Sequence, residues 1–271
     1  VGVVAGISRF DGTRVAMKLH GPAEDAAYLD EVQVLQASLA AAGFPAPAPL
    51  GRRDRTTWEE WLDDGEFRDS HDPRVRSAMA RELARLHLEA RKAAVRPRRV
   101  RHRPDGLWPV PHNALFDFEG TTDGAGWIDE IARAAAAVPP AGEEVVGHDD
   151  WSAKHLRFAD DLTLTAVLDW DSATTELEPT LVGHAAGSFT YTKELGYPIA
   201  LWPTARESLA FIAEYEHYRG EPFTQTERDA AIAAAVYLRA YGARCQHALT
   251  GEGASTGLAA YAAALSGAAR T

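Results

Sequence analysis

The 271-residue sequence contains a single cysteine, Cys245. One cysteine cannot form a disulfide within the chain or a cluster of thiolate ligands, so a secreted disulfide scaffold and a cysteine-based zinc site are both excluded. The sequence also lacks any run of about 18 apolar residues, which a transmembrane helix would need. Its first residues do not show the basic segment of a secretion signal. We therefore expect a cytoplasmic protein with no membrane partner.

Positive charge is also scarce, because 28 lysines and arginines stand against 39 aspartates and glutamates, for a formal net charge of −11. Phosphate backbones and anionic membranes attract basic surfaces, so we do not expect a nucleic acid as partner. An acidic protein favours an amine-containing substrate instead. Residues 91–103 are a basic exception, which we interpret as a solvated loop.

The first sixty residues favour β structure. Residues 14–19 have the pattern of a strand, and the Asp-Gly turn signal at residues 11–12 predicts a hairpin with a strand near Val3. Apolar residues at helical spacing over residues 29–39 predict a helix, and residues 56–62 predict one more strand.

The remainder of the chain is mostly helical in pattern. The turn residues 63–65 end the β-rich part, so we predict a small lobe over residues 1–62 and a larger lobe over residues 63–271. Residues 156–158 and 162–168 predict a short hairpin within the larger lobe. Helices are predicted over residues 73–94, 128–138, 204–218, 226–249 and 257–269.

Two carboxylates follow apolar β segments in the middle of the chain. Asp150 comes after the apolar residues 145–146, and Asp169 comes after residues 164–168, 19 residues beyond Asp150. An unpaired charge beside buried apolar positions costs free energy, which makes both carboxylates candidate functional residues. Their separation suits metal-assisted phosphoryl transfer. Asp171 is a further candidate, although it could instead cap the following turn.

Four motifs follow one another along the chain. Val15-Ala16-Met17-Lys18 looks like the strand-borne lysine motif of the kinase fold, and Asp30-Glu31 resembles its ion-pair partner in the next helix. His148-x-Asp150, with His155, is similar to a catalytic loop of the form H-G-D-x-x-x-x-N, and Leu168-Asp169-Trp170-Asp171 is similar to a metal-binding I-D-W-E segment. Together they resemble the aminoglycoside phosphotransferases and related small-molecule kinases, over roughly residues 14–183.

This resemblance implies an α+β, two-lobed protein-kinase-like fold, in which the N-lobe is an antiparallel sheet plus one helix and the larger C-lobe is mainly helical. It also implies a phosphotransferase that uses Mg²⁺ and moves the γ-phosphoryl group of ATP or GTP to a hydroxyl of a small molecule. An aminoglycoside or another amine-containing alcohol is the expected acceptor.

The resemblance assigns a role to each motif. Lys18 would bind the α- and β-phosphates, and Glu31 would hold the lysine in place. Asp150 would accept or orient the proton of the acceptor hydroxyl, and Asp169 would bind Mg²⁺. His148 would brace the loop.

Residues 59–62 are the expected hinge between the lobes. Main-chain groups of Glu60 and Leu62 would bind the nucleotide base there, while Trp61 gives apolar cover. A plain edge strand is the alternative interpretation.

His155 stands where the family has asparagine, a neutral oxygen ligand for magnesium. Imidazole favours softer metals, so His155 is a predicted metal ligand that makes Mn²⁺ an alternative to Mg²⁺. The other interpretations are that Asp169 holds the metal largely alone, that His155 contacts a phosphate, or that turnover is slow or absent. A kinase-like protein that binds a nucleotide or ligand without transferring phosphate is therefore an alternative function.

A metallohydrolase is a third hypothesis, with His148, Asp150, His155 and Asp169 as the metal ligands. It would leave Lys18 without a role. A Ser-His-Asp hydrolase is excluded, because the sequence has no G-x-S-x-G elbow.

The acceptor pocket is the least defined part of the prediction. Asp69, Glu176 and Glu178 are candidate partners for an amino group. We expect the pocket among the C-terminal helices, although aromatic residues at helical spacing more often form a core. The tyrosines expected around it are Tyr191, Tyr215, Tyr218 and Tyr237.

Overall fold

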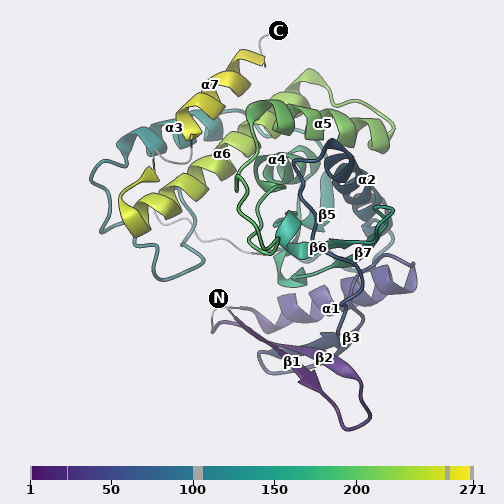
Figure 1. The fold of residues 1–271 in the computed structure, drawn as a ribbon. Coiled ribbons are helices and arrows are strands. Elements are labelled where there is room, and N and C mark those ends of the chain that lie inside the picture. Colours follow the sequence, from purple (N-terminus) through teal and green to yellow (C-terminus); the bar gives the residue numbers. More distant parts are fainter. Residues whose placement is uncertain (1, 23, 100–105, 254–256, 269–271) are drawn as a thin grey trace.

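The computed structural model describes residues 2–22, 24–99, 106–253 and 257–268. A β-rich lobe contains the N-terminal strands, and a larger, mainly helical lobe contains the rest of the chain (Figure 1). The chain passes from the first lobe to the second between Glu60, where the last strand of the first sheet ends, and Glu66, which pairs with Phe158. The division predicted after residue 62 falls within this connection and remains a prediction. Among the described residues, no helix combines the length and hydrophobicity needed to span a bilayer.

The N-terminal lobe is an antiparallel sheet with one helix, as expected. Its strands follow the order β1-β2-β4-β3, where β1 is Val3–Ser8, β2 is Arg14–Leu19, β3 is Pro49–Arg53 and β4 is Thr56–Glu60. The register pairs Lys18 of β2 with Thr57 of β4. Because side chains alternate between the faces of a sheet, Lys18, Thr57 and Glu59 lie on the same face.

Helix α1 (Ala26–Ala41) connects β2 to β3 and contacts both lobes. The Asp25 side chain accepts a hydrogen bond from the Ala27 N–H and so caps the first turn. Toward the larger lobe, the Tyr28 hydroxyl lies 2.8 Å from the carbonyl oxygen of Asp171 and 2.7 Å from that of Ala173. The helix is therefore fixed to the segment that carries Asp171.

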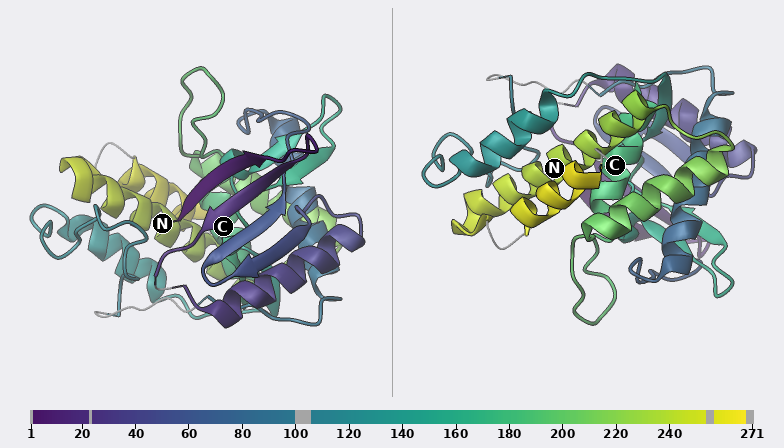
Figure 2. Two further views of the ribbon diagram at one scale, coloured as in Figure 1. Left: turned by 90° about the horizontal axis from the view of Figure 1, so that it is seen from below. Right: turned by 90° about the horizontal axis from the view of Figure 1, so that it is seen from above.

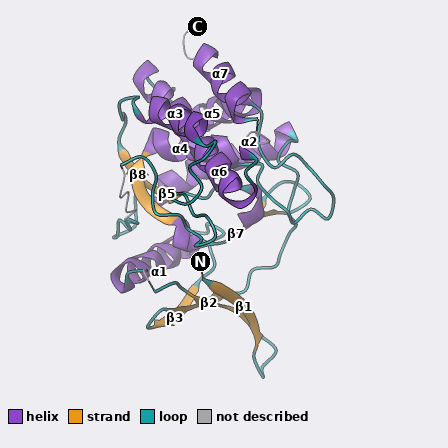
Figure 3. Cartoon of the chain, turned by 90° about the vertical axis from the view of Figure 1, so that its left-hand side faces the viewer, coloured by secondary structure: helices purple, strands orange, loops and turns teal. Residues whose placement is uncertain are grey.

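The larger lobe packs helices around short antiparallel strand pairs, and the helices gather on the side away from the N-terminal sheet (Figure 3). Helices α4 and α6 approach closely at Gly183, where an added Cβ would lie 2.2 Å from the Ala231 carbonyl oxygen. The strand pairs are β5 (Glu144–His148) with β8 (Ala173–Leu177) and β6 (Leu156–Phe158) with β7 (Leu164–Val167), and 3₁₀ turns cover Ala153–His155 and Trp170–Ser172. The helices are α2 (Pro73–Ala90), α3 (Gly126–Ala136), α4 (Glu178–Ser188), α5 (Ala205–Arg219), α6 (Gln225–Thr250) and α7 (Leu258–Ala268).

The basic segment after α2 is mostly exposed to solvent where the structure describes it, and it also forms ion pairs with both lobes. Arg98 pairs with Glu144 at 2.6 Å, and Arg99 pairs with Glu24 of the N-terminal lobe at 2.5 Å. The Thr175 N–H donates to the Pro97 carbonyl. Carboxylates on both lobes therefore hold this segment in place, while residues 100–103 lie outside the described residues.

A buried chain of hydrogen bonds connects α2, α5 and α4 next to β5. His87 Nδ1 lies 2.7 Å from the Tyr215 hydroxyl, which donates to Glu178 Oε1 at 2.6 Å. Since the hydroxyl proton goes to Glu178, His87 must be the donor to Tyr215, and the imidazole is neutral with its proton on Nδ1. Burial lowers the pKa of His87 from 6.5 to about 4.

Acid is expected to destabilise the fold through His87. The unfolded state takes up a proton near pH 6.5, whereas the folded state resists protonation down to about pH 4, so stability falls as the pH decreases through this window. At about 1.36 kcal/mol per pKa unit, the loss in the free energy of unfolding approaches ~3 kcal/mol at pH 4. Urea unfolding at pH 7 and pH 4 measures it. The His87→Gln variant can still donate to Tyr215 but cannot titrate, and an equally large loss in that variant would show that His87 is not the cause.

Candidate active site

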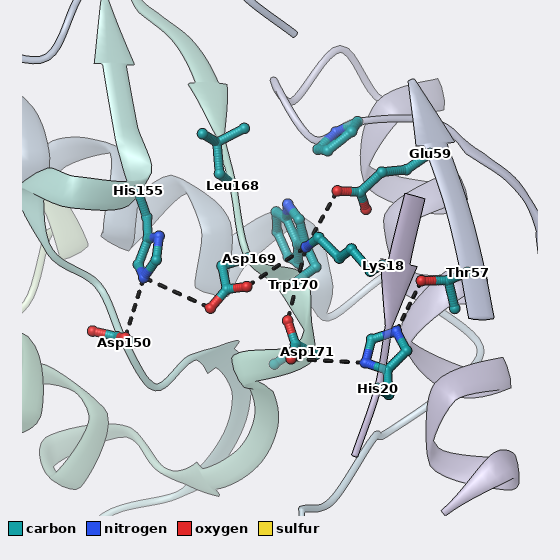
Figure 4. A network of polar contacts seen from close by, with 12 residues as sticks. Lys18, His20, Thr57, Glu59, Asp150, His155, Leu168, Asp169, Trp170 and Asp171 are labelled. Atoms are coloured by element: carbon teal, nitrogen blue, oxygen red, sulfur yellow. Dashed lines mark hydrogen bonds and ion pairs between the residues drawn. The ribbon is translucent and has the colours of Figure 1, made fainter. Parts of the chain in front are cut away.

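A buried lysine faces the larger lobe from β2. The Lys18 side chain is 9% exposed, and its Nζ lies 3.2 Å from Glu59 Oε1, 3.6 Å from Asp169 Oδ1 and 3.8 Å from Asp171 Oδ1 (Figure 4). Burial by itself would lower the pKa of Lys18, but the three carboxylates outweigh it and raise the pKa. Lys18 therefore carries its positive charge at the junction of the two lobes.

The ammonium group of Lys18 has donors to spare. Its Nζ is buried, and no atom in the described part of the chain accepts a hydrogen bond from it with good geometry. An ammonium carries three N–H donors, and leaving a buried donor unpaired costs about 1–3 kcal/mol. A ligand that offers several oxygen atoms, as a phosphate does, would satisfy these donors.

The acid beside Lys18 is Glu59 and not Glu31, so the predicted Lys18–Glu31 ion pair is corrected by the structure. One face of helix α1, which includes Leu29 and Val32, is buried in the core. Glu31 is not on this face and is half-exposed. Glu59 is on the adjacent strand β4 and accepts a further hydrogen bond from Gln36 Nε2 at 2.9 Å. A strand carboxylate thus holds the lysine.

Asp169 comes after β7 with a left-handed backbone, at φ 66°. This conformation is uncommon outside glycine and costs on the order of 1 kcal/mol, but it brings both Asp169 and Asp171 toward Lys18 (Figure 4). Burial raises the pKa of Asp169, yet Lys18 and His155 outweigh it and hold that pKa far below its ordinary value. Burial and the charge of Asp169 raise the pKa of Asp171. Two carboxylates crowded in this way are stabilised by an added cation.

Asp150 lies in the loop after β5, and hydrogen-bond donors surround its carboxylate. Its Oδ2 is 2.7 Å from Lys154 Nζ and 3.1 Å from His155 Nε2, and its Oδ1 accepts from the Ser152 hydroxyl at 3.1 Å. Burial raises the pKa of Asp150, but His155 and Lys154 outweigh it and lower the pKa well below its ordinary value. The carboxylate is ionised and oriented by its partners.

Three of the predicted residues form a cluster that could hold a metal ion. One ligand atom from each of Asp150, His155 and Asp169 lies within 4.8 Å of the others. His148 does not join them, because its Nδ1 accepts the Asp150 N–H and its Nε2 lies 3.0 Å from the Leu168 carbonyl oxygen. Burial lowers the pKa of His148 to about 4, so both ring nitrogens are used by a neutral side chain. The four-ligand set of the metallohydrolase hypothesis is therefore incomplete.

The expected hinge follows the end of β4. The Glu60 N–H donates a hydrogen bond to the Ala48 carbonyl oxygen at 2.9 Å, so this N–H is not available to bind a nucleotide base. The Trp61 ring packs against Gly6 of β1, where an added Cβ would lie 2.6 Å from the indole, and the Arg14 guanidinium stacks 4.0 Å from the ring centroid. The apolar cover of a base by Trp61 and nucleotide binding by Glu60 and Leu62 all remain predictions.

The residues expected around the acceptor are scattered. Tyr215 and Glu178 belong to the buried chain under β5, and Tyr237 packs against Trp108. Tyr218 is on the surface, where its hydroxyl lies 3.0 Å from that of Ser77. Tyr191 does lie beside the loop that carries Asp150, because its carbonyl oxygen accepts the Lys154 N–H.

Two contacts of the site were not predicted: Glu59 was expected in the hinge and not beside Lys18, and Lys154 was not expected beside Asp150. Glu59 lies on the same face of the sheet as Lys18, and the alternation of side chains along the strands could have predicted this. Lys154 is four residues after Asp150, and the 3₁₀ turn Ala153–His155 carries both Lys154 and His155 to the carboxylate. A short loop gives no periodicity from which that orientation could be read.

Comparison with known proteins adds a family and a fold. The model of the family described as "Phosphotransferase enzyme family" matches residues 8–176, which is more than half of the chain. No curated protein sequence gives a significant match.

Solved structures of several kinases have a similar fold. Amicoumacin kinase hAmiN, in complex with AMP-PNP, Ca²⁺ and Ami, has a TM-score of 0.65 at 10% identity, over 97% of this chain and 85% of that one. Choline kinase from Cryptosporidium parvum has a TM-score of 0.58 at 14% identity, and macrolide 2'-phosphotransferase MphH from Brachybacterium faecium has 0.54 at 17%, each over 97% of this chain and 88% of the other. The predicted α+β, two-lobed protein-kinase-like fold is confirmed.

Proposed function

The chain belongs to the phosphotransferase enzyme family, and on this premise we propose that it moves the γ-phosphoryl group of ATP or GTP to a hydroxyl of a small molecule. Family membership and the kinase-like fold support small-molecule phosphotransferase activity. The identities of the nucleotide, the metal and the acceptor are proposed here.

The observation that carries the proposal is the buried, charged Lys18 with unused donors beside Asp169. A site that only needed to bury a lysine would satisfy its donors, since an unpaired buried donor is costly. The neighbouring carboxylates form ion pairs with the ammonium without meeting hydrogen-bond geometry; a polyphosphate would offer oxygen atoms that can, and Glu59 holds the ammonium where such a group could contact it.

A divalent metal fits the donor set. Asp169 and His155 would hold it, and the crowding of Asp169 with Asp171 favours a cation at this point. Bound Mg²⁺ neutralises charge on the phosphates, and Mn²⁺ is the alternative because one ligand is an imidazole. The similar amicoumacin kinase contains AMP-PNP and Ca²⁺.

The chain's own groups then orient the reaction. Asp150 accepts a hydrogen bond from the acceptor hydroxyl, and its low pKa suits a group that positions the hydroxyl and takes the proton late. The acceptor oxygen forms its bond to the γ-phosphorus as the bond to the β–γ bridging oxygen breaks, and the nucleoside diphosphate leaves. Lys18 stays bound to the phosphates that depart.

A protein that binds a nucleotide without transferring phosphate is the second candidate. The ion pairs that occupy Asp150 favour it, because a carboxylate bound by Lys154 and His155 must exchange a partner before it can contact an acceptor. Turnover measurements distinguish the two candidates.

The acceptor is proposed to be an amine-containing alcohol, an aminoglycoside among them, because the chain has a net charge of −11. Similar folds belong to kinases named for amicoumacin, choline and macrolides, so the fold accommodates acceptors of different sizes.

Thermal and chemical unfolding with Mg-ATP or Mg-GTP tests the proposal. A ligand at 100 times its dissociation constant adds about 2.7 kcal/mol to the free energy of unfolding. We expect stabilisation by the nucleotide with Mg²⁺ or Mn²⁺ and much less by either component alone. The absence of any shift at millimolar nucleotide would count against both the enzyme and the binding protein.

A further inference from the structure

Lys154 is a charged residue at the reaction centre to which no role has been given. Its Nζ is 2.7 Å from Asp150 Oδ2, and its side chain remains 31% exposed. Tyr191 holds it from the other side, because the Tyr191 carbonyl accepts the Lys154 N–H at 3.1 Å and Nζ lies 5.3 Å from the ring centroid. Tyr191 begins the loop between α4 and α5, which extends from the body of the larger lobe (Figure 2).

An ammonium group in this position does not help Asp150 to act as a general base. A cation beside a carboxylate stabilises the ionised form and makes Asp150 weaker as a proton acceptor. The Ser152 hydroxyl already donates to Oδ1 at 3.1 Å, so Asp150 is oriented without Lys154. The lysine is better explained by a negative charge that develops nearby during the reaction.

Geometry places that charge within reach. An acceptor oxygen in contact with Asp150 lies about 2.6–3.2 Å from its carboxylate, and the phosphorus lies about 3–3.5 Å beyond the acceptor oxygen in a near-attack arrangement. Nζ is 2.7 Å from the same carboxylate and ends a flexible side chain. A change of rotamer brings it to an oxygen of the transferring group.

We infer that Lys154 is a catalytic residue whose ammonium leaves Asp150 when substrates bind and donates to an oxygen of the transferring phosphoryl group. The inference rests on the proposed function. As the bond from the acceptor oxygen to phosphorus forms and the bond to the nucleoside diphosphate breaks, the acceptor proton passes to Asp150, which Lys154 has released. Lys154 keeps its own proton throughout, and its role is electrostatic.

Lys18, His155 and Lys154 have different partners in the site. Lys18 is held among Glu59, Asp169 and Asp171, where the departing phosphates would lie. His155 reaches back to Asp169, with Nε2 3.7 Å from Oδ2. Lys154 has Asp150 as its carboxylate partner among the described residues and is the cation on the acceptor side.

The test compares Lys154→Met and Lys154→Arg with a matched control, Lys92→Met. Lys92 also pairs with a carboxylate, Glu89 at 2.6 Å, but at the exposed end of α2. Turnover and nucleotide KM are measured by release of nucleoside diphosphate, with acceptor or with water as phosphoryl acceptor. We expect Lys154→Met to lower turnover about 100-fold while nucleotide KM stays within about threefold, as for the loss of one donor to a developing charge. Lys154→Arg should recover part of the loss, and Lys92→Met should match wild type.

A binding measurement makes the test independent of the acceptor. Aluminium fluoride with Mg-ADP mimics the transferring phosphoryl group, so it should stabilise the wild type beyond Mg-ADP alone, and Lys154→Met should lose that increment while keeping the response to Mg-ADP. An undiminished increment in Lys154→Met, no increment in the wild type, or an equal loss of Mg-ADP binding would each overturn the role of Lys154. A wild type that does not respond to Mg-ADP would instead overturn the proposed function.

Discussion

Replacing Asp150 by asparagine is expected to lower phosphoryl transfer by about 10³-fold while leaving nucleotide affinity within about threefold of wild type. Asparagine keeps the shape of the side chain but cannot accept the acceptor proton, and it loses the ionic attraction of Lys154. In the proposed complex the nucleotide would contact Lys18 and the metal, so we expect its binding not to need the Asp150 charge. Initial rates with a panel of hydroxyl acceptors, together with nucleotide titration, measure the two effects separately.

Asp160→Asn is the matched control for this experiment. It makes the same chemical change at a fully exposed carboxylate in the β6–β7 turn, where the partner is Arg68, and should not alter turnover. If Asp150→Asn reduced nucleotide binding as much as turnover, Asp150 would have no role specific to the acceptor.

Replacing Lys18 by methionine is expected to abolish nucleotide-dependent stabilisation and to lower the free energy of unfolding by about 3 kcal/mol. The stability loss arises because Glu59, 8% exposed, keeps a buried charge without its cation, and removing one partner of a buried ion pair costs about 3–5 kcal/mol. The binding loss arises because the phosphates lose their buried ammonium. Urea unfolding with and without Mg-ATP measures both.

A double variant, Lys18→Met with Glu59→Gln, separates the two losses. Glutamine is neutral and can still contact Gln36, which now donates to Glu59 at 2.9 Å, so we expect most of the stability to return. Nucleotide binding should not return, because the ammonium is still missing. Recovery of both would mean that Lys18 contributes through the fold alone.

The sequence predicted those site residues whose chemical type and position beside a buried strand both indicate function. The prediction was wrong for a residue whose orientation depends on the element that its helix packs against. Lys18 and Asp169 come together as expected because each ends or follows an apolar strand that the core fixes. Glu31 has the expected place in a helix, but it lies outside the buried face of α1, and Glu59 is the acid beside Lys18. The strand β3 was not predicted, because a register shift between Pro49 and Gly51 breaks its alternation.

The acceptor side was less predictable for a physical reason. Tyr215 of α5 and Tyr237 of α6 pack into the hydrophobic core with other elements of the larger lobe and not around a pocket. Tyr191 is in a loop with no period, and its position depends on a backbone hydrogen bond to Lys154. Lys154 likewise depends on a single 3₁₀ turn.

The Tyr28 hydroxyl, between the carbonyl oxygens of Asp171 and Ala173, has a mechanical consequence. These hydrogen bonds attach α1 to the segment that carries Asp171. On the other side, Gln36 donates to Glu59 and Gln33 donates to the Gly51 carbonyl oxygen, which attaches the same helix to the sheet. The two lobes therefore cannot separate as rigid bodies without breaking one of these attachments. If the chain binds a nucleotide as proposed, bending of the β1–β2 hairpin rather than hinge opening of the whole lobe would admit it, so exchange of the nucleotide should follow the local motion of that hairpin.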